Sequence, residues 1–424
     1  MDASAVNMHT PPALQGIRVL DLSRVLAGPW ASQILGDFGA EVLKVERPGE
    51  GDDTRRWGPP FIEADSDAYA AYYSCCNRNK EGLAVDFARP EGADLIKRLA
   101  RRSDIFIENF RVGQLRKYGL DYETLSQENP RLIYCSVTGF GQFGPYAGRG
   151  GYDVLIQGMS GLMTMTGHPN DGSEDEPLKV GIPVSDLFAG LYAAVSILTA
   201  LHHRERTGEG QYIDCSLLDS QLVALSNQAA SYLVAGVKPK PLGNEHPTVV
   251  PYRDYATSDG RILVAIMNDR HFRKFCRLLG QPSLADDPRF CSNGDRLANR
   301  RELEDILVPL IRQHNSVDLL AALESEQLPA APINTIDRIL ADPHVRSRKL
   351  QHTLVRDDGV EVPVLGYPHQ MSRTPATVRK APPRLGQDTR RALKSVLGLS
   401  DERLDELEHA GTIADSALRK QQPA

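Results

Sequence analysis

The stretch IRVLDLSRVLAGPWASQILGDFGAEVLKVE, residues 17–46, decides the fold of this chain. Continuous apolar, β-forming residues predict strands at 17–22 and 40–46, and the apolar residues of 30–39 recur with the spacing of a helix. A turn that contains Gly28 and Pro29 joins the first strand to the helix. A strand, a helix and a second strand in this order form one βαβ unit, in which the strands are parallel.

The same alternation continues along the chain. Apolar runs predict further strands at 82–87, 104–110, 131–137 and 211–217, and helical patterns lie at 91–102 and 187–206. Strands that alternate with helices predict an α/β fold with a parallel, doubly wound sheet and helices on both of its faces.

A second, smaller domain is expected in the middle of the chain. A linker rich in Lys and Pro lies at 238–243, and the segment after it has a strand of its own at 261–267. We therefore divide the chain into a large Rossmann-like domain (1–222), a small α+β domain (223–330) and a C-terminal part (331–424). The pattern of the C-terminal part alone does not show which domain it joins.

Charge and cysteine content exclude several classes of function. A net charge of −6 and a pI near 6.0 provide no basic surface for nucleic acid, so we expect no nucleic-acid partner. The six cysteines have no zinc-ligand spacing, and no HExxH motif or Cys/His cluster indicates a metal site. Six thiols in so long a chain are typical of a reduced cytoplasmic protein.

The N-terminus and the longest apolar run give no sign of export or of a membrane. Residues 1–16 lack the basic start and the apolar stretch of a secretory signal. The longest uncharged apolar run, Leu187 to Leu201, has 15 residues, whereas a membrane span needs about 20. We expect a cytoplasmic protein with no membrane partner, in which this run forms a buried helix.

The sequence GFGQFG, residues 139–144, is the one formal cofactor motif. It follows a predicted strand, but a dinucleotide site also needs a helix that opens at the motif. Pro145, Gly148 and the pair at 150–151 prevent such a helix. We interpret this stretch as a glycine-rich loop that lines a pocket and expect no bound nicotinamide cofactor.

Asp186 stands immediately before the longest apolar helix and allows two interpretations. As a helix N-cap, its carboxylate accepts hydrogen bonds from the first free amides of the helix. As a nucleophile, it is kept ionised by the helix dipole at the edge of a doubly wound sheet. Local chemistry favours the cap, and the two roles are compatible.

Basic and amide side chains gather where predicted strands end or begin. Arg47 follows the strand at 40–46, residues 77–80 (Asn-Arg-Asn-Lys) precede the strand at 82–87, and Asn109 and Arg111 follow a third strand. Ligands of open α/β sheets bind beyond the carboxyl ends of the strands, so these cations favour a phosphate-bearing ligand. The alternative for each residue is an ordinary solvated surface charge.

Taken together, these segments resemble the class III CoA-transferase family, also called CaiB/BaiF. The family includes formyl-CoA and carnitine CoA-transferases and α-methylacyl-CoA racemase. The matching segments occur in order over nearly the whole chain, at 14–55, 77–86, 104–120, 129–146, 151–167, 206–219 and 381–389. The segment that contains Asp186 lies between those at 151–167 and 206–219.

The resemblance implies a fold and a partner that patterning does not supply. It implies a Rossmann-like large domain built from both ends of the chain, with the small domain formed by the middle. It also implies an interlocked homodimer, in which each subunit threads through the other.

The resemblance also implies roles for individual residues. Asp186 matches the catalytic aspartate, which forms an acyl-aspartyl anhydride and then an aspartyl-CoA thioester. CoA and acyl-CoA are expected as substrates, with no permanently bound cofactor. The residues that match CoA-contacting positions are Val25, Ala27, Arg47, Asn77, Arg78, Asn79, Lys80, Asn109, Phe110 and Lys117. Gly139, in the glycine-rich loop described above, is a further candidate for CoA binding.

One residue separates the transferase branch of the family from the racemase branch. The racemase segment equivalent to GYDVLIQ (151–157) carries a histidine base where this chain has Tyr152. A tyrosine, with a pKa near 10, is a poor base at neutral pH, so we favour a transferase. The alternatives are an α-methylacyl-CoA racemase or epimerase, and a CoA-binding protein without catalytic activity.

The substrate acids are indicated less directly. Residues 242–260 resemble the stretch found in family members that use succinyl-CoA with small dicarboxylic acids such as glutarate or citramalate. A second carboxylate needs a cation or hydrogen-bond donors, and we nominate Arg149, His246 and Arg253, together with Tyr152, as residues that contact the acid. The alternative for the three nominated basic side chains is ordinary hydrogen bonding within loops.

Overall fold

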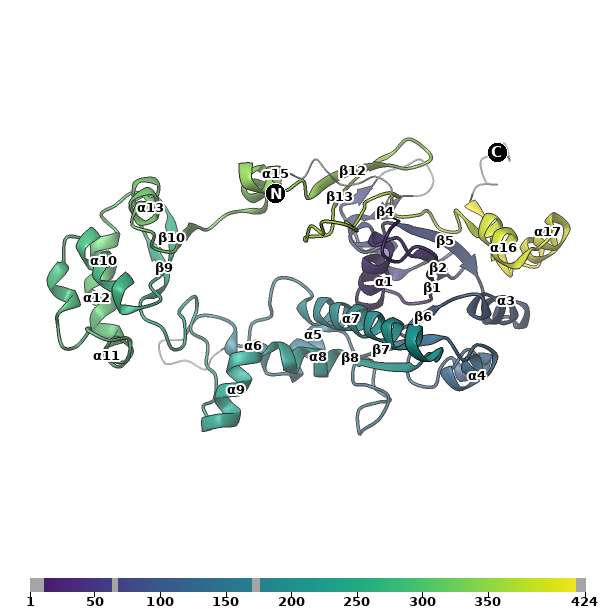
Figure 1. Cartoon of the computed structure of the whole chain (residues 1–424), viewed down its shortest axis with the longest axis horizontal. Helices are drawn as coiled ribbons and strands as arrows, with labels where there is room; N and C mark the ends of the chain where they lie inside the picture. The colour runs from purple at the N-terminus through teal and green to yellow at the C-terminus, as the bar shows by residue number, and fades with distance from the viewer. Residues whose placement is uncertain (1–10, 63–67, 170–175, 417–424) are drawn as a thin grey trace. The chain divides into compact units, whose positions relative to one another are not determined.

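The computed structural model describes residues 11–62, 68–169 and 176–416. The chain forms two compact units (Figure 1). The first unit contains Met1–Ser160, Val180–Ala235 and Arg348–Ala424, and the second contains Gly161–Lys179 and Gly236–Ser347. Both ends of the chain therefore belong to the first unit.

A seven-stranded sheet, in the order β14-β5-β2-β1-β6-β7-β8, forms the centre of the first unit. Every neighbouring pair in it is parallel except β14 and β5, which are antiparallel. This arrangement confirms the predicted α/β fold with a parallel sheet. The strands are β1 (Arg18–Asp21), β2 (Glu41–Glu46), β5 (Lys80–Val85), β6 (Ile105–Glu108), β7 (Ile133–Thr138), β8 (Tyr212–Ser216) and β14 (Ile413–Ala414).

The βαβ unit predicted at 17–46 is present, but its helix starts earlier than predicted. Helix α1 (Ala27–Asp37) contains Gly28 and Pro29, which the sequence analysis assigned to the turn. Proline is tolerated in the first turn of a helix because the amide that it lacks would have no partner there. Strands β1 and β2 pair in parallel, with Val19 opposite Val42.

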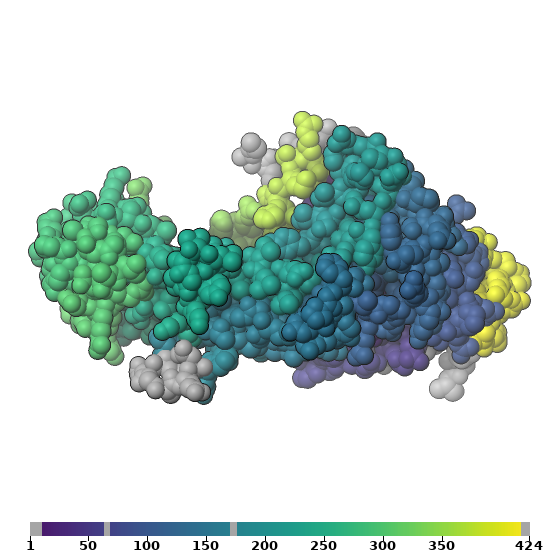
Figure 2. All heavy atoms as spheres, turned by 90° about the horizontal axis from the view of Figure 1, so that it is seen from below, coloured from purple at the N-terminus to yellow at the C-terminus, as the bar shows by residue number. Residues whose placement is uncertain are grey.

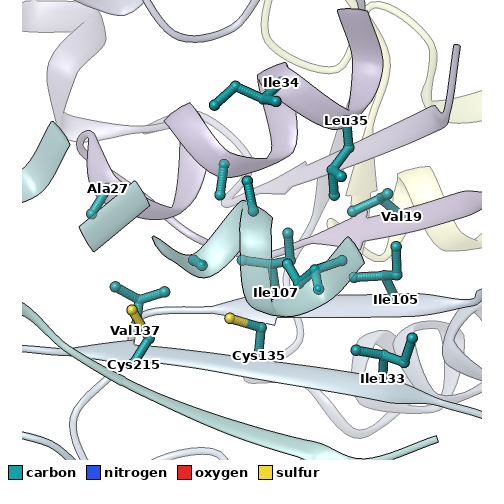
Figure 3. Packing of buried hydrophobic residues seen from close by; sticks show 14 of the residues in the cluster. Val19, Ala27, Ile34, Leu35, Ile105, Ile107, Ile133, Cys135, Val137 and Cys215 are labelled. Carbon is teal, nitrogen blue, oxygen red and sulfur yellow. The ribbon is translucent and has the colours of Figure 1, made fainter. Parts of the chain in front are cut away.

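Alternating residues of the strands belong to two clusters of buried apolar side chains, one on each face of the sheet. Val19, Ile105 and Ile133 point to the face that α1 covers, and Figure 3 shows them opposite Leu35 of α1. Their neighbours along the chain, such as Leu20 and Phe106, belong to the second cluster. Helices that contribute to the second cluster are α3 (Pro90–Arg101), α4 (Tyr122–Glu128), α16 (Thr389–Leu397) and α17 (Asp401–His409).

Helix α7 (Val184–Thr207) packs on α1 in the first cluster. Gly190 allows a close approach, because a Cβ atom there would lie 2.6 Å from the carbonyl oxygen of Ala27. By length and composition this helix is apolar enough to cross a membrane, but half of its most apolar window is buried inside the protein. Such a finding is typical of the core helix of a folded domain.

The C-terminal segment packs against the first unit through main-chain hydrogen bonds. The Asn79 amide donates to the carbonyl oxygen of Lys380 over 3.0 Å, and Ile413 of β14 lies opposite Val85 of β5. The remaining elements of this unit are β3 (Phe61–Ile62), β4 (Tyr69–Ala70), α2 (Ala71–Ser74), α5 (Asp153–Met159), α8 (Leu217–Ala224), α9 (Ser226–Ala235), β12 (Gln351–Val355) and β13 (Glu361–Leu365), with short 3-10 turns at Asp53–Arg56 and Arg116–Tyr118.

The second unit is an α+β body with its own core. Its antiparallel sheet, β11-β10-β9, is covered by helices that bury Phe272, Phe275 and Leu303. The elements are α6 (Leu162–Met165), β9 (Tyr252–Ala256), β10 (Arg261–Ala265), α10 (Asp269–Leu278), α11 (Asn293–Ala298), α12 (Arg300–Ile311), α13 (Ser316–Ser325), β11 (Ala330–Pro332), α14 (Ile336–Ala341) and α15 (Pro343–Ser347), with a 3-10 turn at Pro282–Ala285.

The bounds of the second unit differ from the small domain predicted at 223–330. Residues 223–235, which form the end of α8 and all of α9, belong to the first unit, whereas residues 331–347 belong to the second. The second unit also takes 161–179, and the Gly243 amide donates to the Gly167 carbonyl over 2.8 Å. Composition identifies the linker at 238–243. The backbone contact that joins 161–179 to the second unit links distant residues and cannot be predicted from local sequence.

Candidate active site

A cavity of about 260 Å³ opens at the carboxyl ends of β1, β6 and β7 in the first unit. This is the edge at which open α/β sheets bind their ligands. The loops that follow these strands supply most of its wall. The lining residues are Arg24, Val25, Leu26, Ala27, Asp53, Asn109, Phe110, Arg111, Val112, Gln114, Val137, Thr138, Gly139, Ala147, Arg149, Gly150, Gly151, Tyr152, Asp186 and Leu217.

Eight of the residues predicted to be catalytic or to contact CoA or the acid lie together in this wall, as does Arg111. Asp186 comes from the first turn of α7, Ala27 begins α1, and the other six come from the loops after β1, β6 and β7. They are Val25, Ala27, Asn109, Phe110, Gly139, Arg149, Tyr152 and Asp186.

Asp186 is the third residue of α7 and not its N-cap. The capping is done by Asp153, at the start of α5, whose Oδ1 accepts hydrogen bonds from the amides of Ser185 at 2.7 Å and Asp186 at 3.2 Å. The other oxygen of Asp153 accepts from Gln157 at 2.6 Å. The free amides that the sequence analysis assigned to Asp186 are thus occupied by a remote carboxylate.

The carboxylate of Asp186 is buried and has no hydrogen-bond partner among residues 11–62, 68–169 and 176–416. Burial, and to a smaller extent the negative charge of Asp153, raise the pKa of Asp186 to about 7. The expectation that the helix terminus keeps this carboxylate ionised is therefore wrong, because Asp153 takes the amides and adds a like charge. A carboxylate without hydrogen bonds or ion pairs is a strong nucleophile once it is ionised.

Asn109 holds the loop after β1 in place. Its side-chain oxygen accepts from the Arg24 amide at 2.8 Å, and its Nδ2 donates to the Arg24 carbonyl oxygen at 2.7 Å. The guanidinium of Arg24 lies over the ring of Phe110, 5.5 Å from its centroid. The loops after β1 and β6 therefore form one connected wall.

Three arginines line the cavity, and two of them have no acidic partner. Arg24 pairs with Asp53 at 3.2 Å. In the described parts of the chain, Arg111 and Arg149 form no ion pair, and Arg149 stacks on Tyr146 with 4.2 Å between guanidinium carbon and ring centroid. Guanidinium groups without a counter-ion favour phosphate or carboxylate ligands.

Gly139, the first glycine of the GFGQFG stretch, packs closely against the backbone of Gly151. A Cβ atom on Gly139 would lie 2.5 Å from the Cα of Gly151, so neither position has room for a side chain. The next helix, α5, begins only at Asp153. The stretch forms a loop in the cavity wall, as the sequence analysis interpreted it.

The turn at 77–80 supports the fold with its side chains. All four residues are buried, Arg78 pairs with Asp37, and Lys80 pairs with Asp21 at 3.2 Å. Lys80 also donates to the Pro29 carbonyl and to the Asn77 side chain, both at 2.9 Å. These side chains stabilise α1 and the strand before it, and they do not line the cavity. Their predicted contact with CoA stays a prediction.

Arg47 and Lys117 also lie outside the cavity wall. Arg47 is largely exposed and pairs with Glu50 at 3.2 Å, whereas the Lys117 ammonium lies 4.7 Å from the ring centroid of Tyr118. Their predicted contact with CoA stays a prediction as well.

His246 and Arg253 belong to the second unit, where both have partners. Arg253 pairs with Glu245 at 2.6 Å, and His246 stacks on Tyr252 with ring centroids 5.0 Å apart. Burial and the charge of Arg300 lower the pKa of His246. Within this unit Arg253 is charge-compensated, and its predicted contact with the acid stays a prediction.

Three residues that shape the cavity were not predicted from the sequence. Asp153 caps α7, Asp52 binds the backbone of Val25, and Arg24 stacks on Phe110. Asp153 stands within the quoted segment at 151–157, yet nothing local links it to a helix that begins about thirty residues later. Among the described residues, no group of three or more His, Cys, Asp or Glu side chains is arranged to hold a metal ion.

Comparison with known proteins gives one consistent picture. The profile of CoA-transferase family III matches residues 14–389. The chain is 49% identical over 378 residues to succinate–glutarate CoA-transferase of Agrobacterium fabrum, covering 89% of this chain and 94% of that protein. It is 40% identical over 411 residues to human succinyl-CoA:glutarate CoA-transferase, covering 96% and 91%. A crystal structure of a CaiB/BaiF family protein from Brucella suis superposes with a TM-score of 0.81 at 45% identity, covering 91% of this chain and 100% of that one.

Proposed function

Because the chain belongs to CoA-transferase family III, and is therefore a CoA-transferase, we propose that it moves CoA from succinyl-CoA to a small dicarboxylic acid such as glutarate. The observation that carries this proposal is the buried carboxylate of Asp186, which has no partner among the described residues, in a cavity that also contains two arginines without an ion pair in that part of the chain. The two relatives named above, whose names specify succinate or succinyl-CoA and glutarate, support the choice of acids.

The first half of the reaction uses Asp186 as nucleophile. A carboxylate oxygen of Asp186 attacks the thioester carbon of succinyl-CoA, and the C–S bond breaks to release CoA thiolate and leave a succinyl-aspartyl anhydride. The thiolate then attacks the aspartyl carbonyl. Succinate leaves with one oxygen that came from Asp186, and an aspartyl-CoA thioester remains.

The second half reverses these steps with the acceptor. A carboxylate of the acceptor attacks the aspartyl thioester and expels CoA thiolate, which gives a new mixed anhydride. The thiolate attacks the acceptor side of this anhydride, forms the product acyl-CoA and restores the carboxylate of Asp186. Anhydrides hydrolyse readily, so the loop at 139–151 is proposed to exclude water from the cavity.

Arg149 is our first candidate for the second carboxylate of the acid. It lines the same cavity as Asp186 and, within the described residues, has no acidic partner. Arg111 shares these properties and is available for a phosphate group of CoA. The backbone of Val25 and Ala27, together with Asn109, Phe110 and Gly139, is proposed to hold CoA near the thioester.

We propose that the active form is the interlocked homodimer. The α7, α8 and α9 helices expose a run of apolar side chains, and the teal atoms of this stretch lie at the surface in Figure 2. Monomeric proteins rarely expose so many apolar residues together. The exposed side chains are Leu191, Tyr192, Val195, Leu198, Leu222, Val223, Tyr232, Leu233 and Val234.

A panel of donors and acceptors tests the function. Purified protein is mixed with succinyl-CoA, acetyl-CoA or a branched acyl-CoA and with mono- or dicarboxylic acids, and new acyl-CoA esters are separated and identified. We expect the fastest transfer from succinyl-CoA to glutarate or a similar dicarboxylate. Solvent deuterium that enters the α-carbon of a branched acyl-CoA without any transfer would identify a racemase instead.

A further inference from the structure

Val25 has a backbone conformation that its side chain disfavours. Its φ is +68°, in the left-handed region, where a β-branched residue is a clear outlier. Such a conformation persists only where the surrounding structure enforces it, and it is frequent at functional sites. Val25 lines the same cavity as Asp186.

A buried ion pair enforces this conformation. The amide of Val25 donates to both carboxylate oxygens of Asp52, at 3.2 Å each. Lys44 donates to Asp52 at 3.0 Å and to the Ser23 carbonyl at 2.9 Å, and the side chains of Lys44 and Asp52 are fully buried. Burial alone would raise the pKa of Asp52, but the charge of Lys44 and hydrogen bonds from Thr54 outweigh it and keep the carboxylate ionised.

The residues after Val25 carry amides that are free to bind a ligand. Leu26 is the N-cap of α1 and makes no capping hydrogen bond with its side chain, and the first turn has no acidic residue. In the described part of the chain, no acceptor is present for the amides of Leu26, Ala27 and Gly28. Leu26 and Ala27 share the cavity wall with the carboxylate of Asp186, which is itself buried and unpartnered.

We propose that Asp52, held by Lys44, is a positioning residue that keeps Val25 in its strained conformation, so that the first amides of α1 stabilise the oxyanion formed when the thioester or anhydride carbonyl is attacked. This role rests on the proposed function, because it acts on intermediates formed at Asp186. Amides that are already oriented toward a developing negative charge lower the barrier without tightening substrate binding. Asp52 therefore affects the rate of the chemical steps more than the affinity for CoA.

The test compares Asp52→Ala with the double variant Asp52→Ala/Val25→Gly. Glycine adopts a positive φ without steric cost, so it should recover the loop conformation even without Asp52. We expect Asp52→Ala to lower kcat by about 100-fold or more while the KM for succinyl-CoA changes by less than about threefold. The double variant should recover about tenfold of this loss.

A matched control separates positioning from general stability. Asp254→Asn removes a buried, ion-paired carboxylate in the second unit and should lower the melting temperature without lowering kcat. The proposal is overturned if Asp52→Ala keeps wild-type kcat, if Asp254→Asn loses as much kcat as Asp52→Ala at a similar drop in melting temperature, or if adding Val25→Gly to Asp52→Ala restores no activity. A wild-type protein that transfers no CoA to any acid would instead overturn the proposed function itself.

Discussion

At the scale of single residues, the distinctive feature is the buried carboxyl group of Asp186, which forms no stabilising hydrogen bond or ion pair with the described residues. Asp186 is 9% exposed and forms no hydrogen bond through its carboxylate within the described residues, and the negative charge of Asp153 raises its pKa further. Its pKa of about 7 means that it changes charge near neutral pH. Both activity and stability should therefore depend on this group.

Activity should increase with pH through the pKa of Asp186. Only the ionised form attacks, so kcat/KM for succinyl-CoA rises as the pH rises through about 7 and is constant above it. In Asp153→Asn the side-chain oxygen still accepts hydrogen bonds from the α7 amides, but the negative charge next to Asp186 is removed. The midpoint of the pH profile of kcat/KM should therefore fall by about half a pH unit or more. Asp121→Asn, which changes the cap of α4, is the control and should leave the midpoint where it is.

Removing the charge at Asp186 should stabilise the fold while it abolishes transfer. A folded-state pKa raised from 3.8 to about 7 means that ionisation costs stability, and the cost grows with pH between these values and is constant above the upper one. Asp186→Asn should therefore increase the unfolding free energy above neutral pH by no more than about 4 kcal/mol.

Thermal melts at several pH values measure this effect. The difference between the Asp186→Asn variant and the wild type should disappear near the unfolded pKa of 3.8. An equal difference at every pH would show that the charge of Asp186 is not its cause.

At the scale of helices and strands, the site depends on the contact between α1 and α7. Gly190 on α7 lies against the Ala27 carbonyl, and this contact brings the first turns of the two helices together. The first turn of α1 carries amides that have no acceptor among the described residues, and the first turn of α7 carries Asp186, the proposed nucleophile. The relative position of two helices therefore determines the geometry of one reaction centre.

Adding a methyl group at this contact should damage both stability and activity. The Cβ atom of Gly190→Ala would lie 2.6 Å from a backbone oxygen that cannot move far, so α7 must shift. We expect a loss of about 1–3 kcal/mol in unfolding free energy, with a larger proportional loss of kcat than of CoA binding. Gly181→Ala meets no atom within 4 Å and is the matched control, whose normal stability would support this account.

Six of the seven strands of the central sheet, together with α1, α3 and α7, could be predicted from hydrophobic pattern, because their apolar residues form continuous runs or recur with the period of a helix. The errors occur where a distant residue decides a local outcome. Asp153 caps α7 from 32 positions away in the chain, so local sequence assigned the cap to Asp186. The basic turn at 77–80 pairs its charges with Asp21 and Asp37, 59 and 41 positions away, and its predicted contact with CoA stays a prediction.

At the scale of the whole molecule, the chain builds one unit from both of its ends and a second from its middle. The first unit contains the complete cavity described above, together with the exposed apolar helices α7 to α9. The interlocked dimer was implied by family resemblance and has no signal in hydrophobic periodicity. The exposed apolar side chains are the feature of this structure that supports it.

A charge on the exposed face of α7 tests the proposed dimer. Val195 is 59% exposed, and Val195→Glu should yield monomers or aggregates in sedimentation analysis because a buried, unpaired carboxylate opposes association. Val317→Glu, at a residue that is 73% exposed in the second unit, is the control and should sediment as the wild type does. A wild-type protein that sediments as a monomer would contradict the dimer.

The central claim is that the Asp186 carboxylate exchanges oxygen with both acids during transfer. The most direct measurement gives the enzyme unlabelled succinyl-CoA and glutarate labelled with heavy oxygen, and then determines the mass of the peptide that contains residue 186. The account predicts that one heavy oxygen atom enters Asp186 during the first turnover and appears in succinate during later ones. Complete transfer of CoA with no label in Asp186 would contradict the account.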